Sequence, residues 1–228
     1  MNQSESWQTT PLFRNLTQAE LAHITQDMIE RHYLPGEIIF HEGDAGQLFY
    51  LVKSGQVRIF VNGLDGSETS VILMGSPGQM FGELAVIDGL PRSATAVAMH
   101  HTTLYTLTRE AFSAHIRAIP QFSLNFLQEL STRLRYNTRQ MDSLASLGVP
   151  QRLARKLLEL AQNYGQARAD GVTIHITLTQ TDLASLIGAT RESTNKSLRD
   201  FRQQQWIRVS QGVITLLDPE ALRTQVAG

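Results

Sequence analysis

The chain has 228 residues, enough for one large domain or two modest ones, and 42% of them are hydrophobic, an ordinary share for a protein that buries a core. It contains no cysteine, so disulfides, thiolate zinc sites and iron–sulfur clusters are excluded. No apolar run approaches the roughly 20 residues of a membrane span. Residues 1–6 also lack the basic and apolar parts of a signal peptide, so we expect a cytoplasmic protein with no membrane partner.

The net charge of −1 hides an asymmetry between the two ends of the chain. Residues 146–228 carry ten Lys and Arg and seven Asp and Glu, a net charge of +3. Residues 1–145 carry ten and fourteen, a net charge of −4. A mildly basic C-terminal part fits contact with nucleic acid.

The N-terminal half changes from a helical pattern to a β pattern. Thr17 and Glu20 form a capping box that predicts a helix start. From about Arg31, short β-type runs alternate with glycine-containing turns, which favours an antiparallel sandwich or roll. The expected strands are Glu37–Phe40, Leu48–Val52, Val57–Val61, Val71–Met74, Ala94–Ala98 and Thr103–Leu107.

The stretch Phe81–Ala96 has the residue types of an anion site. Gly82 and Glu83 can open a short helix, whose N-terminus offers free backbone N–H groups to an anion. Arg92 supplies a planar fork of donors for a phosphate. A carboxylate would repel a phosphate, so Glu83 should face another part of the ligand, such as a sugar hydroxyl. Together these residues predict a nucleotide.

A β-roll can also be a cupin enzyme, whose metal site needs His-x-His with a downstream Glu and another His. Here His41 stands alone before Glu42. His100 and His101 are adjacent, so a strand would point their side chains to opposite faces. We find no nucleophile–base pair either. We therefore expect no metal site, no catalytic residue and no enzyme.

A long helix follows the β-type region. Thr108 is expected to cap a short helix through Ile116, and Pro120 then begins a helix with no breaker before Gly148. Its length is about 27 residues, or roughly 40 Å. Residues spaced alternately by three and four form a heptad seam, which predicts a parallel coiled coil between two copies. These residues are Leu127, Leu130, Leu134, Asn137, Met141 and Leu144.

Two alternatives apply to this helix. It can pack on its own β-roll instead of a second copy, which is what we expect of Phe122 and Phe126. The polar residue Asn137 can simply fix the register of a coiled coil, at a cost in stability.

The C-terminal part begins at the hinge Gly148-Val149-Pro150, and a helix started by Pro150 follows. We expect a loop over residues 163–171 and an extended run over residues 172–177. Thr179 and Asp182 cap a first short helix, Gly188 supplies a tight turn and Thr190 caps a second helix, which together predict a helix-turn-helix. Its inward residues are Leu183, Leu186, Ile187, Thr194, Leu198 and Phe201, and its wing is the hairpin of Trp206–Val209 and Val213–Leu217.

The second helix of this motif presents a polar face. Arg191, Glu192, Asn195 and Arg199 share it, and Lys196 adjoins it. Arg can donate twice to guanine, Glu can accept from the amino group of cytosine, and Lys can reach guanine or phosphate. The alternative is an ordinary solvated helix face.

Two motifs resemble those of a known family. Phe81-Gly82-Glu83-Leu84-Ala85 with Pro91-Arg92-Ser93-Ala94 resembles the phosphate-binding cassette of cyclic-nucleotide-binding domains. Thr190-Arg191-Glu192-Ser193-Thr194-x-Lys196 resembles the Ser-Arg-Glu-Thr-Val-x-Arg recognition helix of the Crp/Fnr transcription regulators. The resemblance spans about residues 11 to 217. It implies an α+β fold: a jelly-roll type β-roll that binds cyclic nucleotide (residues 1–118), a dimerisation helix (119–147) and a winged helix-turn-helix (148–228).

The resemblance also implies a ligand and its site. The ligand is a cyclic nucleotide, with cAMP favoured, that acts as an allosteric effector and not as a catalytic cofactor. Glu83 accepts from the ribose 2′-hydroxyl, Arg92 pairs with the phosphate, and Asn137 and Thr138 meet the base. Cyclic-AMP-responsive members often have Thr then Ser at those two positions. The full implied set is Gly82, Glu83, Leu84, Ala85, Arg92, Ser93, Ala94, Arg133, Asn137 and Thr138.

The implied partners are a two-fold site on double-stranded DNA, a second copy of the chain and RNA polymerase. Arg191, Glu192 and Lys196 contact bases by this match, and hydroxyls contact phosphates. The implied DNA-binding set is Thr179, Thr190, Arg191, Glu192, Ser193, Asn195, Lys196 and Arg199. Two alternatives stay open: a cyclic-nucleotide sensor that acts through a protein partner, and a family member that binds DNA without nucleotide.

Overall fold

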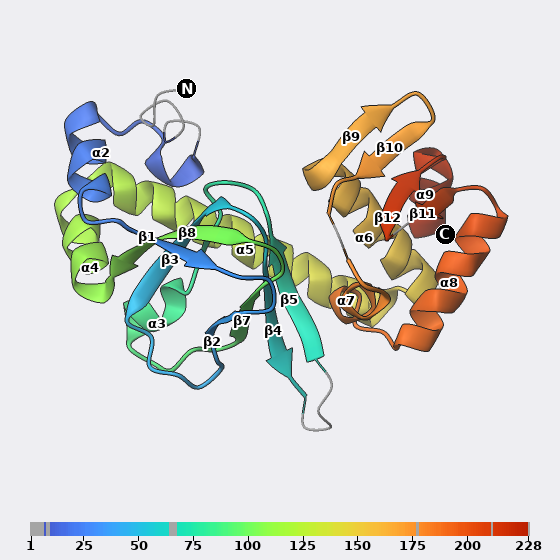
Figure 1. Ribbon diagram of the computed structural model, residues 1–228, viewed down its shortest axis with the longest axis horizontal. Coiled ribbons are helices and arrows are strands. Elements are labelled where there is room, and N and C mark those ends of the chain that lie inside the picture. The colour runs from blue at the N-terminus through green and yellow to red at the C-terminus, as the bar shows by residue number, and fades with distance from the viewer. Residues whose placement is uncertain (1–6, 8–9, 64–67, 177, 211, 228) are drawn as a thin grey trace. The chain divides into compact units, whose positions relative to one another are not determined.

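The computed structural model describes residues 7, 10–63, 68–176, 178–210 and 212–227. The chain divides into two compact units, one of residues 1–67 and 71–136 and the other of residues 68–70 and 137–228. Figure 1 labels the elements of both units, and each unit is described by itself below. No helix in the described ranges is long and apolar enough to cross a membrane.

The first unit begins with two helical segments, the 3-10 helix η1 (Pro11–Phe13) and α2 (Gln18–Thr25). Thr17 caps α2 as predicted. Its Oγ1 accepts from the backbone N–H of Glu20 at 3.2 Å, and the Glu20 carboxylate accepts from the backbone N–H of Thr17 at 2.8 Å. Both partners of the capping box are therefore satisfied.

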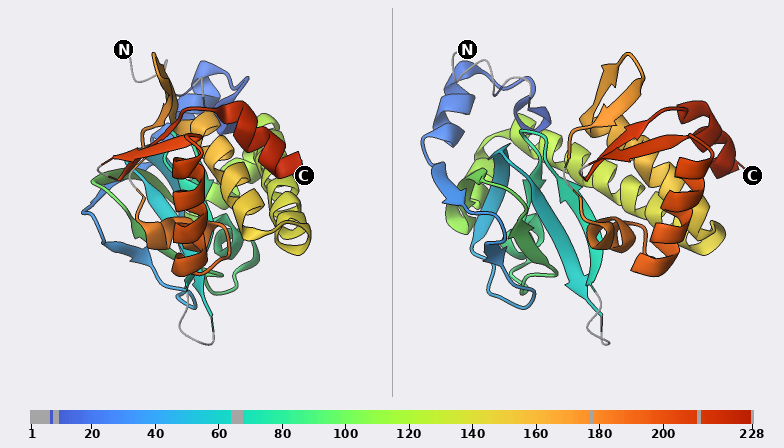
Figure 2. Two further views of the ribbon diagram at one scale, coloured as in Figure 1. Left: turned by 90° about the vertical axis from the view of Figure 1, so that its right-hand side faces the viewer. Right: turned by 45° about the vertical axis from the view of Figure 1, so that its right-hand side comes forward.

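Eight strands of the described chain build the predicted β-roll (Figures 1 and 2). They form two four-stranded sheets, in the orders β1-β8-β3-β6 and β2-β7-β4-β5. The pairs β1–β8, β3–β8, β3–β6, β2–β7 and β4–β7 are antiparallel. Their bounds are β1 (Ile29–Tyr33), β2 (Ile38–Phe40), β3 (Leu48–Ser54), β4 (Val57–Asn62), β5 (Glu68–Met74), β6 (Met80–Phe81), β7 (Thr95–Ala98) and β8 (Thr102–Thr108).

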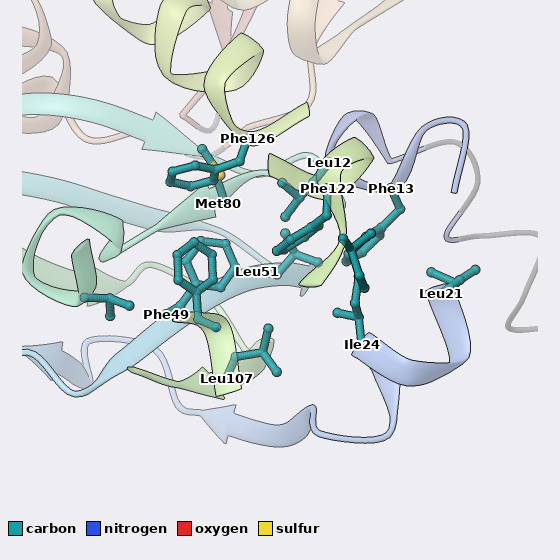
Figure 3. Packing of buried hydrophobic residues seen from close by; sticks show 13 residues of the cluster. Leu12, Phe13, Leu21, Ile24, Phe49, Leu51, Met80, Leu107, Phe122 and Phe126 are labelled. Atoms are coloured by element: carbon teal, nitrogen blue, oxygen red, sulfur yellow. The ribbon is translucent and has the colours of Figure 1, made fainter. Parts of the chain in front are cut away.

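Strand β3 is buried on both faces because it lies between two apolar clusters. Tyr50 and Val52 join a cluster with residues of both sheets. Phe49 and Leu51 point the other way, since successive side chains of a strand alternate, and join a cluster with the helices (Figure 3). That second cluster attaches α2, α4 (Arg109–Ala118) and the start of α5 (Pro120–Ser146) to the roll.

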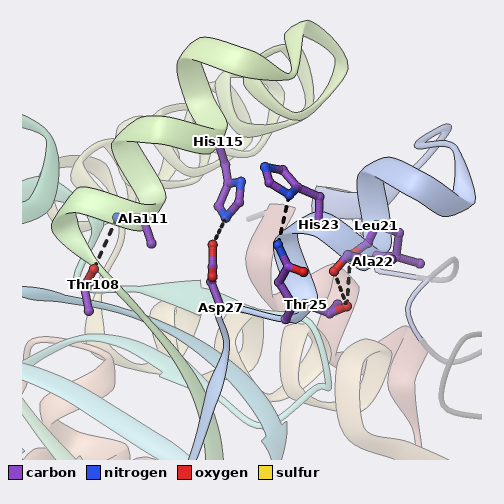
Figure 4. A network of polar contacts seen from close by, with 9 residues as sticks. Leu21, Ala22, His23, Thr25, Asp27, Thr108, Ala111 and His115 are labelled. Carbon is purple, nitrogen blue, oxygen red and sulfur yellow. Dashed lines mark hydrogen bonds and ion pairs between the residues drawn. The ribbon is translucent and has the colours of Figure 1, made fainter.

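A buried histidine of α4 bonds to Asp27, the second residue after the end of α2 (Figure 4). His115 is 1% exposed, and its Nε2 lies 2.8 Å from Oδ2 of Asp27. The ring of His23 meets the His115 ring edge-on, with centroids 5.0 Å apart. The other ring nitrogen of His115, Nδ1, is buried and has no hydrogen-bond partner among the described residues. Asp27 is thus the side chain that satisfies this buried ring.

Helix α5 spans 27 residues, Pro120–Ser146, as predicted. Phe122 and Phe126 are buried in the first unit, which confirms that the N-terminal end of α5 packs on its own roll. Leu130 also packs against that cluster, so it is not a free seam residue. Other seam positions are exposed: Leu127 by 58%, Leu134 by 69%, Met141 by 71% and Leu144 by 49%.

The second unit holds the remaining elements. Helix α6 packs against α8 and α9, and a four-stranded sheet has the order β11-β12-β10-β9. The loop predicted over residues 163–171 is wrong except at residues 169 and 170. Helix α6 continues to Tyr164, and β9 pairs antiparallel with β10, which begins at Gly171. Residue 177, the end of the predicted extended run, lies outside the described residues. The bounds are α6 (Val149–Tyr164), β9 (Gly165–Arg168), β10 (Gly171–Ile174), α7 (Gln180–Leu186), α8 (Arg191–Gln203), β11 (Ile207–Ser210), β12 (Val213–Leu216) and α9 (Pro219–Ala227).

Candidate functional site

The cassette stretch folds as β6, a glycine turn and α3 (Glu83–Asp88). Gly82 occupies the turn with φ of +74°, a left-handed conformation that favours glycine. A Cβ built at Gly82 would lie 2.7 Å from Nη1 of Arg92 and 3.0 Å from Cδ2 of Tyr50. This glycine therefore allows both the turn and the close approach of the arginine.

Arg92 lies inside the roll and is only 5% exposed. Its Nη1 donates to the carbonyl of Gly82 and its Nη2 to the carbonyl of Leu48, each at 2.6 Å. Its guanidinium carbon lies 4.2 Å from the centroid of the Phe40 ring. Burial lowers the pKa of Arg92, but an arginine in a protein remains protonated.

One donor of Arg92 is left over. Its Nε is buried and has no hydrogen-bond partner in the described part of the chain. A buried cation that bonds to backbone carbonyls, and to no carboxylate among the described residues, favours the approach of an anion. This property fits the negatively charged phosphate of a cyclic nucleotide.

The loop of residues 43–46 covers Arg92 closely. The backbone N–H of Arg92 donates to the carbonyl of Asp44, and the N–H of Gly43 donates to the carbonyl of Arg92, both at 2.8 Å. A Cβ at Gly46 would come within 2.2 Å of Cβ of Ala85 and 3.2 Å of Cζ of Arg92. Sequence reasoning treated these glycines only as turn residues and missed this contact.

Glu83 is 4% exposed and pairs with an arginine of the long helix. Nη1 of Arg133 donates to Oε1 of Glu83 at 2.7 Å, and Nη2 of Arg133 donates to the carbonyl of Met80. The structure thus brings two predicted ligand residues, Glu83 and Arg133, into direct contact. Of the other predicted cassette residues, Leu84 and Ser93 are exposed, whereas Ala85 and Ala94 are buried.

Asn137 and Thr138 lie further along α5, in the second unit. Asn137 follows Arg133 by four residues, so the two share a helix face. Asn137 is half-buried and Thr138 is exposed. Their contact with a base stays a prediction.

The predicted helix-turn-helix consists of α7, a turn and α8. Oγ1 of Thr179 donates to Asp182 at 2.6 Å and accepts from its backbone N–H at 3.1 Å. The turn contains Gly188 at φ of +60°. Oγ1 of Thr190 accepts from the backbone N–H of Ser193 at 3.2 Å and donates to its hydroxyl at 3.0 Å. The two threonine hydroxyls thus cap helices, and their contact with DNA phosphate stays a prediction.

Helix α8 separates its buried and exposed residues as the sequence predicted. The six residues expected to face inward, from Leu183 to Phe201, are all buried. Of the six residues of α8 that were predicted to contact DNA, four are exposed and two are half-buried. The exposed ones are Arg191, Glu192, Lys196 and Arg199, and the half-buried ones are Ser193 and Asn195. An exposed polar face on the second helix is the arrangement by which such motifs contact base edges.

Sequence reasoning missed a cavity beside this face. Its volume is about 340 Å³, and it lies between α7, α8 and β11. Two of its residues, Asn195 and Arg199, were predicted for DNA contact, but Gln180, Arg202 and Val209 were not. Arg202 follows Arg199 by three residues, so extending the helical face by one turn would have found it.

A β-roll with a buried arginine, together with a winged helix-turn-helix, defines a class of ligand-responsive DNA-binding proteins. The sequence matches the cyclic nucleotide-binding domain over residues 30–118 and the Crp-like helix-turn-helix domain over residues 151–225. The chain belongs to the Crp/Fnr family of transcription regulators, and it is a cyclic-nucleotide-responsive, DNA-binding regulator. This confirms the predicted fold class and regulator function.

Two relatives cover almost the whole chain. A CRP-like cAMP-activated global transcriptional regulator of Mycobacterium tuberculosis is 33% identical over 92% of this chain and 94% of its own length. A cyclic AMP receptor protein of Thermus thermophilus is 33% identical over 93% of this chain and 95% of its own length.

Solved structures agree on the fold. The Thermus thermophilus catabolite activator protein has a TM-score of 0.55 at 33% identity and covers 96% of this chain and 99% of its own. The c-di-GMP responsive regulator CLP of Xanthomonas campestris has a TM-score of 0.77 at 22% identity, over 88% and 99%, a likeness that concerns the fold alone.

Proposed function

We propose that cAMP is the effector of this regulator and that it binds in the cassette between Arg92 and Glu83. The observation that carries the proposal is the buried Arg92 guanidinium with its unpartnered Nε, which suits the cyclic phosphate. The buried carboxylate of Glu83 suits a ribose hydroxyl. The names of the two relatives that are 33% identical to this chain both refer to cAMP.

The remaining ligand contacts follow the residue match. The backbone of Gly82, Leu84 and Ala85, with Ser93 and Ala94, completes the phosphate cradle. Arg133 holds Glu83 in place at 2.7 Å, and Asn137 and Thr138 contact the base. Asn137 carries both a donor and an acceptor, so it can hydrogen-bond to the edge of adenine.

The response is a shift between two populations of a dimer. The nucleotide binds more tightly to the form in which the two recognition helices are about one DNA turn apart. In that form, Arg191, Glu192 and Lys196 contact bases of a two-fold site, while Thr179, Thr190 and Ser193 contact phosphates. The bound regulator then contacts RNA polymerase. Because its partner is DNA, it acts in the cytoplasm.

Calorimetry with cAMP, cGMP and c-di-GMP tests the effector. We expect the wild-type chain to bind cAMP most tightly. In Arg92→Met the phosphate loses a buried charged partner. The binding free energy for cAMP should weaken by about 2 kcal/mol or more, which raises the dissociation constant roughly 30-fold. Arg117→Ala is the matched control, because Arg117 is an exposed arginine of α4 outside the cassette.

Three outcomes contradict the proposal. Preference for cGMP or c-di-GMP overturns cAMP as effector. Equal binding by wild type and Arg92→Met overturns the cassette as the site. DNA affinity that no nucleotide changes, measured in a gel shift on genomic fragments, identifies a family member that binds DNA without nucleotide.

A further inference from the structure

We propose that Phe40 is a positioning residue of the nucleotide site, whose ring holds the guanidinium of Arg92 in the orientation that receives the phosphate. The inference rests on the proposed function and adds to it a residue from outside the cassette. Phe40 is the last residue of β2. The guanidinium carbon of Arg92 lies over its ring, 4.2 Å from the centroid. This is well inside the roughly 6 Å over which a cation and an aromatic face attract each other.

Two further rings brace Phe40 from behind. Tyr50 of β3 and Phe81 of β6 stack with their centroids 4.9 Å apart and an angle of 9° between their planes. The centroid of the Phe40 ring lies 5.6 Å from that of Tyr50 and 6.0 Å from that of Phe81. Tyr50 and Phe81 are both buried, so Phe40 packs against a pair of rings that the core holds in place. We call these three residues the aromatic cage.

The aromatic cage attracts Arg92 without neutralising it. A carboxylate in the place of Phe40 would form an ion pair with Arg92 and compete with the phosphate for the same charge. The face of a ring attracts a cation through its quadrupole and carries no net charge. The attraction is larger away from water, and Arg92 is only 5% exposed. The cage can therefore hold the buried cation and still leave its positive charge for the nucleotide.

The phenol of Tyr50 also stays uncharged. Burial raises the pKa of Tyr50, and the positive charge of Arg92 opposes this rise only in part. Burial, and after it the interaction with Tyr50, raise the pKa of the neighbouring Tyr33 to about 12. Neither phenol is ionised at neutral pH. Tyr50 thus gives Arg92 a second neutral ring, with its centroid 5.5 Å from the guanidinium carbon, and no phenolate that would compete with the phosphate.

Phe40 restrains a movement that the hydrogen bonds of Arg92 allow. Nη1 and Nη2 donate to the carbonyls of Gly82 and Leu48, which fixes one edge of the guanidinium plane. The ring of Phe40 meets the face of that plane. Without the ring, the plane can tilt about the two carbonyl bonds, and the direction of the Nε–H bond changes. That Nε has no hydrogen-bond partner among the described residues and is the donor proposed for the phosphate.

Calorimetric titration of the full-length chain with cAMP tests the inference. Phe40→Leu and Phe40→Met both remove the aromatic face and keep an apolar side chain, so either one that folds serves the test. We expect the dissociation constant for cAMP to rise about five- to thirtyfold, the range of a desolvated cation–π contact. Phe40→Tyr keeps the ring and should restore the affinity.

Phe60→Leu is the matched control. Phe60 is buried on β4, and its ring carries Arg58, whose guanidinium carbon lies 4.3 Å from the centroid. The same substitution there removes an arginine–phenylalanine contact outside the cassette, so the affinity for cAMP should stay as in the wild type.

A double-mutant cycle with Arg92→Met separates positioning from a general structural effect. If Phe40 acts through Arg92, then adding Phe40→Leu to Arg92→Met should change the affinity by less than about twofold. A loss that is as large in the Arg92→Met background as in the wild type would overturn the inference.

Three other results bear on the inference. Wild-type affinity in Phe40→Leu or Phe40→Met overturns it, and so does an equal loss in Phe60→Leu. If the wild type binds no cAMP, the proposed site fails and this inference fails with it. If the wild type binds cAMP and Arg92→Met weakens binding, but the Phe40 variants do not, the site stands and only the role of Phe40 is overturned.

Discussion

His115 shows how one side chain can fasten two elements. It is 1% exposed, and its bond to Asp27 joins α4 to the residues that follow α2. Asp27→Ala would leave both ring nitrogens of the buried histidine without a protein partner. Because the Asp27 side chain is itself 41% exposed, water can replace part of the bond, so we expect a loss of only about 1 kcal/mol of unfolding free energy.

Urea unfolding measures this loss directly. Asp142→Ala is the control, because Asp142 is an exposed carboxylate on α5. Equal midpoints for the two variants would show that the Asp27–His115 contact adds nothing to stability.

Single residues also show how much of the ligand site could be predicted from the sequence. Glu83 and Arg92 stood out because their residue types and their separation suit a nucleotide. Phe40 and the carbonyl of Leu48 did not, because an aromatic ring and a backbone group on other strands carry no local signal. Only the folding of β2 and β3 around Arg92 brings them together.

At the scale of elements, the turn between β6 and α3 depends on Gly82. Gly82→Ala would place a Cβ 2.7 Å from Nη1 of Arg92, besides the strain of a positive φ, about 1–2 kcal/mol. We therefore expect a loss of stability and at least a tenfold loss of cAMP affinity, measured by calorimetry.

Gly36→Ala distinguishes the strain of a positive φ from the close approach of a Cβ to Arg92. Gly36 has φ of +81°, but a Cβ there meets nothing within 4 Å. This variant should lose similar stability and keep its affinity. If Gly82→Ala binds cAMP as well as Gly36→Ala does, the close approach to Arg92 has no role in the site.

The exposed apolar face of α5 predicts self-association. Leu127→Asp removes one buried leucine from each chain of the dimer, and each burial contributes about 1.5–3 kcal/mol. The dimer dissociation constant, measured by sedimentation equilibrium, should therefore rise at least roughly 100-fold. Ile29→Asp is the control, since Ile29 is also apolar and 55% exposed but belongs to β1 and not to α5. An equal effect of both changes would contradict the seam on α5.

Sequence patterns predicted the long helices and most interior strands of the roll, but not β1 or β9. Four of the five residues of β1 are exposed, and β9 is Gly165-Gln166-Ala167-Arg168. Each lies at the edge of its sheet and is held by the backbone ladder, so neither needs an alternating apolar pattern. An alternating apolar pattern can predict only those strands that bury side chains in a core.

At the scale of the whole molecule, nucleotide and DNA binding must be linked reciprocally. A coupling free energy of about 1–3 kcal/mol corresponds to a change in affinity of roughly 5–150-fold. We expect saturating cAMP to raise DNA affinity by a factor in this range. Saturating DNA should raise cAMP affinity by the same factor, measured by calorimetry on the protein–DNA complex. No change in either direction would show that the two sites act independently.

Helix α5 carries Arg133, which pairs with Glu83, and also the exposed Leu127 and Met141. One helix therefore carries residues of both the proposed ligand site and the surface expected to meet a second chain. If association changes how α5 is held, the nucleotide response becomes dependent on protein concentration. The copy number of the regulator would then act as a second input beside the nucleotide, and the expression level of its own gene would set the threshold of the switch.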